Sequence, residues 1–150
     1  MKRYSLPFIL LLSACAPAQR PAVVDPAFTQ YVQKWNSLYP DHLANEVSIK
    51  FDDLSKYSDS KGTVVGLCSY DDNGDVVSVD PTFWNKVLDY TREELMFHEL
   101  GHCVLGLKHN CSLKPDGTPV SVMYPYVFEL SDTTESYYFN ELKTDQSNCD

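Results

Sequence analysis

Three of the chain's four histidines lie in the segment HELGHCVLGLKH, at positions 98–109. On a helix, residues four positions apart project from the same face, so His98 and His102 can direct two imidazoles at one point. Glu99 lies about 100° round the helix from His98, where a carboxylate can reach a nearby water without binding a metal itself. The pattern His-Glu-x-x-His is typical of zinc hydrolases, in which the glutamate is the general base.

A catalytic zinc ion needs a third protein ligand and an open coordination position. Gly106 can take the left-handed conformation that ends a helix, and His109 follows three positions later. We therefore expect His98, His102 and His109 to bind one zinc ion, with Glu99 as the catalytic residue. Imidazoles also bind copper, nickel and iron, but a glutamate placed to activate water favours a Lewis acid over a redox metal.

The segment resembles the long zinc signature of the metzincin metallopeptidases, His-Glu-x-x-His-x-x-Gly-x-x-His. The stretch SVMYP is similar to the Met-turn of that family, in which Met123 would lie under the metal. The resemblance implies a small zincin-like α+β domain that hydrolyses peptide bonds by Glu-assisted attack of a zinc-bound water. In some relatives a tyrosine near this turn reaches the metal, which makes Tyr126 a candidate for that role.

This chain departs from the metzincin signature at one point. Three residues, not two, separate His102 from the glycine, whereas the spacing from Gly106 to His109 is unchanged. One additional residue turns the exit of the helix by about 100°. The position of His109 is therefore the feature that a structure has to test.

The remaining elements follow from hydrophobic periodicity and from turn residues. Asp25 and Pro26 start an amphipathic helix, and Thr91 and Glu94 form a capping box that starts the helix of the histidines. The pattern predicts an α+β fold with a mixed, mostly N-terminal sheet, an active-site helix and a C-terminal helix. The expected helices are 25–39, 91–105 and 133–143, and the expected strands are 46–54, 63–70 and 75–80, the last two joined as a hairpin. In metzincin relatives an edge strand pairs with the peptide substrate, but the alternation does not say which strand of this hairpin is at the edge.

The N-terminal residues predict export and a lipid anchor. Residues 1–14 have a charged start and an apolar run that is too short to span a bilayer, as in a secretory signal. LSAC at 12–15 resembles the lipobox of bacterial lipoproteins, which implies a lipidated Cys15, a tether to residue 24 and a catalytic domain over 25–150. Because Ala16 and not an aspartate follows, the resemblance points to the outer membrane. An ordinary signal peptide is the alternative.

The four other cysteines predict two disulfides, since an even number in an exported protein is typical of a disulfide framework. Sequence alone allows three pairings. Our first choice joins Cys68 to Cys103, on the apolar back of the helix away from the metal, and Cys111 to Cys149. A buried free thiol at Cys103 is the alternative.

The formal charge of −9 disfavours nucleic acid as a partner, because an acidic surface repels phosphates. We expect a peptide or protein substrate, and membrane contact through the lipid anchor only. Two other functions stay open: a zinc-binding envelope lipoprotein that binds without proteolysis, and a peptidoglycan amidase.

Overall fold

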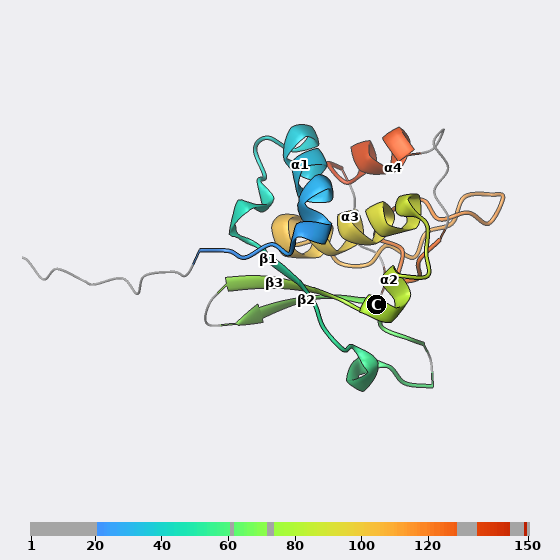
Figure 1. Cartoon of the computed structure of the whole chain (residues 1–150). Coiled ribbons are helices and arrows are strands. Elements are labelled where there is room, and N and C mark those ends of the chain that lie inside the picture. The colour runs from blue at the N-terminus through green and yellow to red at the C-terminus, as the bar shows by residue number, and fades with distance from the viewer. Residues whose placement is uncertain (1–20, 61, 72–73, 129–134, 145–148, 150) are drawn as a thin grey trace, which may run out of the picture.

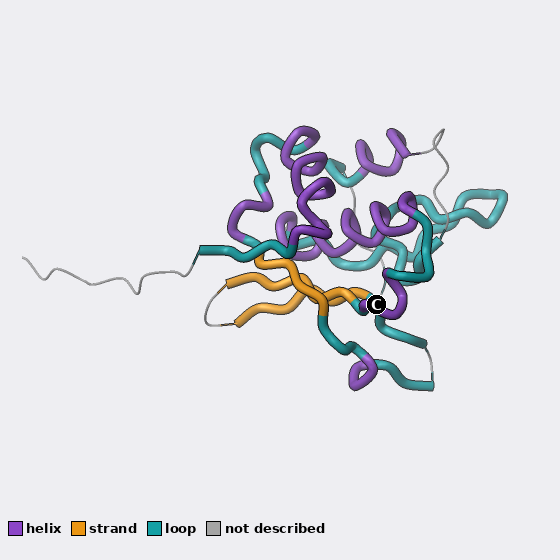
Figure 2. The backbone as a smooth tube through the Cα atoms, in the orientation of Figure 1, coloured by secondary structure: helices purple, strands orange, loops and turns teal. Residues whose placement is uncertain are grey.

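A three-stranded mixed sheet, crossed on one face by a long helix, forms the centre of the structure (Figures 1 and 2). The computed structural model describes residues 21–60, 62–71, 74–128, 135–144 and 149. The strand order is β1-β3-β2, with β1 parallel and β2 antiparallel to β3. In the described part of the sheet β2 is therefore an edge strand, which answers the question that the alternation left open. The strands are β1 (Ser48–Phe51), β2 (Gly66–Asp71) and β3 (Gly74–Val79).

The long helix α3 (Asp89–Leu105) packs against β2 and β3, and α1 (Thr29–Leu38) packs against α3. Figure 1 shows α1 and α4 (Glu135–Glu141) on the side of α3 that is remote from the sheet. The structure is thus an α+β fold with a mixed sheet and a few helices. The short helical segments are η1 (Pro26–Phe28), η2 (Ala44–Glu46), η3 (Ser55–Tyr57) and α2 (Pro81–Trp84).

Aromatic packing fixes the rotation of α3 about its axis. Phe97 is fully buried, its ring stacked at 3.8 Å on Phe139 and 5.3 Å from Trp35. Apolar burial and such ring pairs are the main source of core stability. Because Phe97 and Leu100 are turned into this core, the faces that carry His98 and His102 are turned towards the cleft described below.

The start of α3 corrects one sequence prediction. The helix begins at Asp89, two residues before Thr91, and its N-cap residue Leu88 makes no side-chain capping bond. Thr91 is instead buried in the first turns, so the capping box predicted for Thr91 and Glu94 is wrong. Other helix signals hold: the Asp25 side chain accepts a hydrogen bond from the Ala27 N–H.

The other boundaries are close to those expected. The first strand is shorter than 46–54, the hairpin of the second and third strands is present, and the last helix begins at Glu135 within the described residues. The signal 1–14, Cys15, the tether as far as residue 20 and turn residues 72 and 73 lie outside the described residues. None of the described helices is long and apolar enough to cross a bilayer.

Candidate metal centre

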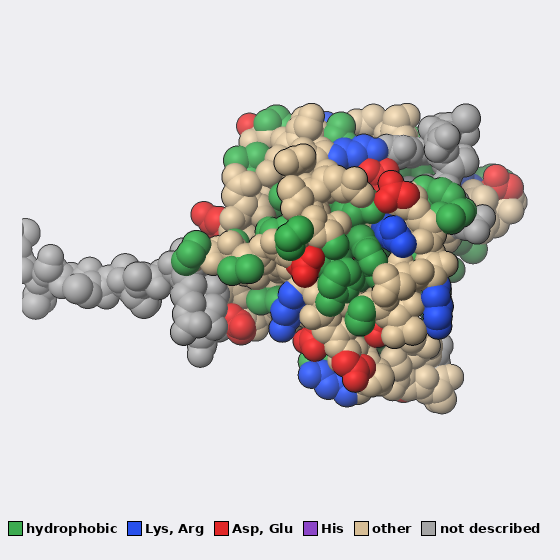
Figure 3. Space-filling view, viewed as in Figure 1, with side chains coloured by type: hydrophobic (Ala, Val, Ile, Leu, Met, Phe, Trp, Pro, Cys, Tyr) green, Lys and Arg blue, Asp and Glu red, His purple; other side chains and the backbone are tan. Residues whose placement is uncertain are grey.

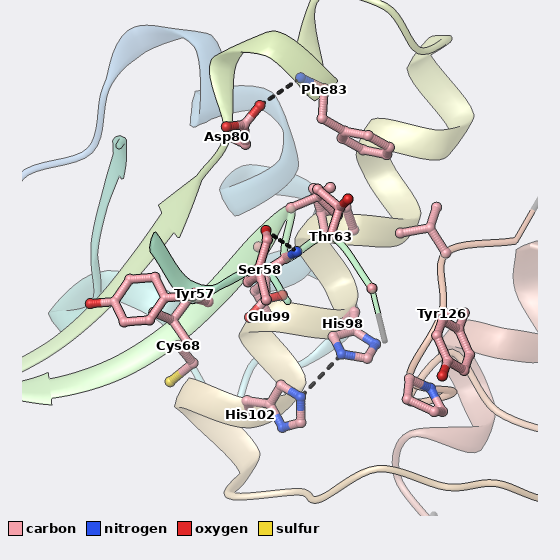
Figure 4. A pocket seen from close by; sticks show the side chains of 18 of the residues that line it. Tyr57, Ser58, Thr63, Cys68, Asp80, Phe83, His98, Glu99, His102 and Tyr126 are labelled. Atoms are coloured by element: carbon pink, nitrogen blue, oxygen red, sulfur yellow. Dashed lines mark hydrogen bonds between the residues drawn. The ribbon is translucent and has the colours of Figure 1, made fainter. Parts of the chain in front are cut away.

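The side chains of His98, His102 and His109 converge on one point. One ring nitrogen from each lies within 4.8 Å of the other two. His98 and His102 come from α3, and their rings point at each other across one helical turn (Figure 4). Among the described residues, no other group of three His, Cys, Asp or Glu side chains comes this close together.

Backbone carbonyls orient two of these rings. His98 Nδ1 lies 2.8 Å from the carbonyl oxygen of Val122, and His102 Nδ1 lies 2.6 Å from that of Leu107. A carbonyl oxygen can only accept, so each Nδ1 carries the proton and donates. Each Nε2 then keeps its lone pair, which is the tautomer that a metal ligand requires and the usual arrangement around protein-bound metals.

The spacing of the nitrogens fits a small cation. The Nε2 atoms of His98 and His102 are 3.1 Å apart, and two nitrogens on one tetrahedral zinc ion, each about 2.05 Å from it, would be about 3.3 Å apart. Burial lowers the pKa of His98 to about 3, helped by the neighbouring His102, and it also lowers the pKa values of His102 and His109. The three rings are therefore neutral at pH 7, as metal binding requires.

The loop after α3 absorbs the additional residue of the signature. Gly106 ends the helix at φ 66°, and the Leu107 N–H donates to the Gly101 carbonyl. The same Leu107 supplies the carbonyl that orients His102. Beyond it, the Cys149 N–H donates to the His109 carbonyl at 3.3 Å. The longer helix therefore still returns His109 to the other two rings.

Met123 lies fully buried, with its side chain against Gly101 of α3. Its N–H is held by the Ser121 hydroxyl at 2.9 Å, and its carbonyl accepts from the Asn110 N–H at 2.9 Å. A Cβ atom at Gly101 would lie only 2.5 Å from the Met123 sulfur, so the Met123 side chain packs directly on α3 at this glycine. The turn around Met123 thus links the base of the site to the loop that carries His109.

Glu99 is buried against the edge strand. Its carboxylate accepts a hydrogen bond from the Cys68 N–H, and a Cβ at Gly66 would overlap Glu99 Oε1. Burial raises the pKa of Glu99 to about 8, and the Cys68 bond opposes that rise. Glu99 and His98 both line the same cleft, so a proton acceptor and the imidazole cluster face one space.

The disulfides follow the first-choice pairing, Cys68 with Cys103 and Cys111 with Cys149. The place of the first bridge differs from the expectation. Cys68 belongs to the edge strand β2 and lines the cleft, so the bridge stands beside Glu99 and not behind the helix. The physical reason is that β2, and not a strand remote from the metal, covers this side of α3.

The site opens into a cleft of about 1300 Å³ between β2 and the segment 124–127. Tyr126, 60% exposed, lies across the cleft from His98 (Figure 4). On the face shown in Figure 3, acidic and basic side chains lie in small mixed groups around a hydrophobic patch, and no histidine is seen. His42, expected at the surface, is exposed and takes no part in the cluster.

Glu94 is a cleft residue that the sequence analysis did not identify as functional. It lines the cleft although its side chain is only 1% exposed. Its Oε1 accepts from the Phe128 N–H at 3.4 Å, and its Oε2 has no hydrogen-bond partner among the described residues. The available signal was its position four residues before His98, on the same face of the helix.

In comparisons with known proteins, the chain matches no protein-family model, no curated protein and no solved structure at a significant level. What can be inferred about function therefore rests on the residues of this cleft.

Proposed function

We propose that this chain is a zinc-dependent endopeptidase of the metzincin kind, which acts on the exported side of a bacterial envelope. The observation that carries the proposal is the meeting of three imidazoles and one buried carboxylate on an open cleft. A purely structural metal site would need the three rings but would have no use for Glu99 at the same cavity.

Zinc is the metal that this ligand set favours. His98, His102 and His109 would hold it through ring nitrogens, and three neutral imidazoles leave the ion its full positive charge. When bound, such an ion acts as a Lewis acid that makes a water easier to ionise and polarises the substrate carbonyl. The absence of thiolates from the cluster, since all four cysteines of the domain are in disulfides, also speaks against a closed structural site.

In this proposal Glu99 moves the proton. Its carboxylate takes a proton from the attacking water and then delivers it to the nitrogen of the leaving amine. The Cys68 N–H and the absence of a side chain at Gly66 hold the carboxylate in one place beside the histidines. Burial raises the pKa of Glu99 towards neutral pH, and a base with such a pKa suits proton transfer in both directions near pH 7.

The edge strand β2 offers a place for an extended peptide. It pairs with β3 on one side only within the described sheet, and four of its residues line the cleft. Added-strand pairing gives affinity through backbone hydrogen bonds and positions alternate side chains in pockets. These four residues are Gly66, Leu67, Cys68 and Tyr70.

Export is supported by the two disulfides, because such bridges persist in oxidising compartments. Together with the lipobox-like LSAC, they favour a lipid-anchored protein of the cell envelope, at the outer membrane.

The experiment is metal analysis and proteolysis on the same protein. We expect one zinc per chain, cleavage of an unfolded protein substrate that a chelator abolishes, and loss of roughly 10²–10⁴-fold in turnover in Glu99→Ala with zinc retained. Persistent activity in that variant would rule out the mechanism. Zinc without any peptide cleavage would indicate the binding lipoprotein, and cleavage of muropeptides alone would indicate the amidase.

A further inference from the structure

The cleft contains a second carboxyl group that the proposed mechanism does not use. In the part of the chain that the structure describes, Glu94 Oε2 is buried without a hydrogen-bond partner, and Oε1 accepts only the long bond from the Phe128 N–H. A buried acid with an unpaired oxygen is costly, and native proteins rarely keep one without a role. The Glu94 side chain lines the cleft, so a ligand in the cleft is the natural source of the missing partner.

The position of Glu94 relative to the histidines limits which part of a ligand can meet it. Glu94, His98 and His102 follow one another at intervals of four on α3, so they form one stripe along the helix. One such interval is about 6 Å along the helix axis. If the reacting bond lies over His98 and His102, a long side chain next to that bond can reach Glu94.

The surroundings favour a cationic end on that side chain. Although Lys86 also lines the cleft, one wall is formed by the segment 124–127, whose side chains are aromatic or apolar and carry no charge. Such a wall suits the methylene stem of a lysine or arginine, and the carboxyl group at the bottom suits its charged end. Burial raises the pKa of Glu94 to about 9, which reflects the absence of a positive partner, and the approach of a cation would lower it again.

We infer that Glu94 is a specificity-determining residue that selects substrates with a lysine or arginine flanking the scissile bond. This inference rests on the proposed peptidase function, whose site it shares.

The test compares peptides that differ at one position. Lysine or the uncharged norleucine is placed first at the position before the scissile bond and then at the position after it. For each peptide, kcat/KM is measured with zinc-loaded protein. At one flanking position, lysine should be preferred by about tenfold or more, and Glu94→Gln should remove the preference. Glu94→Met, which should reverse it, serves as a second variant if Glu94→Gln folds poorly.

The matched control is Glu93→Gln. Glu93 is the neighbouring residue, forms an ion pair with Lys34 at 2.7 Å and does not line the cleft. Its substitution removes a surface carboxylate from the same helix, so it shows how much of any lysine preference comes from the acidic surface as a whole. A preference lost equally in Glu93→Gln, or no lysine preference at any position, would overturn the inference and leave the peptidase proposal intact.

A binding measurement tests the lysine preference independently of catalysis. The same lysine and norleucine peptides are titrated calorimetrically into zinc-loaded Glu99→Ala, with and without Glu94→Gln. Should the wild-type protein cleave nothing, a lysine preference of about tenfold that vanishes with Glu94→Gln would still support the selective pocket. Equal binding of both peptides would reject it.

Discussion

At the scale of single residues, the cleft holds two buried acids in different settings. Glu99 has a backbone donor and lies against the imidazole side of the cleft, whereas one oxygen of Glu94 finds no partner in residues 21–60, 62–71, 74–128, 135–144 and 149. Burial raises both pKa values, to about 8 and about 9. Each acid is therefore maintained at a cost in stability, which is typical of groups retained for function.

Glu94 should make the protein less stable as the pH rises. Its pKa is about 9 when folded and near 4.5 when unfolded, so between these values the folded state binds the extra proton. Glu94 begins to lower the free energy of unfolding near pH 4.5. The reduction grows to about 3 kcal/mol at pH 7 and is complete above pH 9. We expect Glu94→Gln to raise the free energy of unfolding by about that amount at pH 7 and by less than about 1 kcal/mol at pH 5.

Urea unfolding of metal-free protein at both pH values measures this difference. Glu93→Gln is again the control, since loss of a surface ion pair should cost less than about 1 kcal/mol at either pH. A gain for Glu94→Gln that does not depend on pH would contradict the assignment of the raised pKa.

The two acids also show what sequence could reveal about single residues. The position of Glu99 beside the histidines was predictable because it follows from a local spacing on one helix. Glu94 was not, because Thr91-x-x-Glu94 imitates a capping motif and only tertiary packing shows that Glu94 turns into the cleft. Local patterns limit the roles that a side chain can take, and contact with residues far away in sequence, such as Phe128, decides which role it takes.

At the scale of elements, the close approach of β2 to α3 positions the base. The strand and helix are joined by the Cys68–Cys103 disulfide and by the bond from Cys68 to Glu99. A bridge between residues 35 positions apart contributes about 4 kcal/mol by limiting the unfolded chain. The sequence predicted both elements, but it could not say that β2 is the edge strand, because alternation alone does not encode strand order.

Gly66→Ala directly tests the close packing of β2 against α3. The added methyl group would overlap Glu99 Oε1 and lie 2.8 Å from the side chain of Leu95, so the base has to move. We expect kcat to fall by about 100-fold, since small misplacements of a reacting group are this costly, while zinc binding is retained. Gly62→Ala is the matched control, because its methyl group would meet only the Tyr126 ring at 4.0 Å. Equal activities in the two variants would show that Glu99 does not need its present position.

At the scale of the whole molecule, the site joins segments that are far apart in the chain. The histidine cluster depends on α3, on the turn at Met123 and on Cys149, which is bridged to Cys111. The zinc signature was readable because its residues are neighbours in sequence. The contact between Cys149 and His109 was not, since only the folded chain brings them together, although the pairing of the cysteines pointed towards it.

Breaking the Cys111–Cys149 disulfide should therefore weaken metal binding by His109. In Cys111→Ser/Cys149→Ser we expect zinc affinity to fall by roughly 10- to 100-fold, as for other groups that support a metal ligand. Competition with a chromogenic chelator measures that affinity. Cys68→Ser/Cys103→Ser, which leaves the support of His109 intact, is the control and should lose stability and turnover more than zinc affinity. Equal losses of affinity in the two double variants would contradict this division of roles.

The bond from Cys149 to His109 also sets an order of events during synthesis. Translation proceeds from the N-terminus, so His98, His102 and His109 are all made before residue 149 is added. A growing polypeptide that carries the three histidines still lacks the group that holds the last of them in place. The three histidines can thus reach their final arrangement only after nearly all of these 150 residues have left the ribosome.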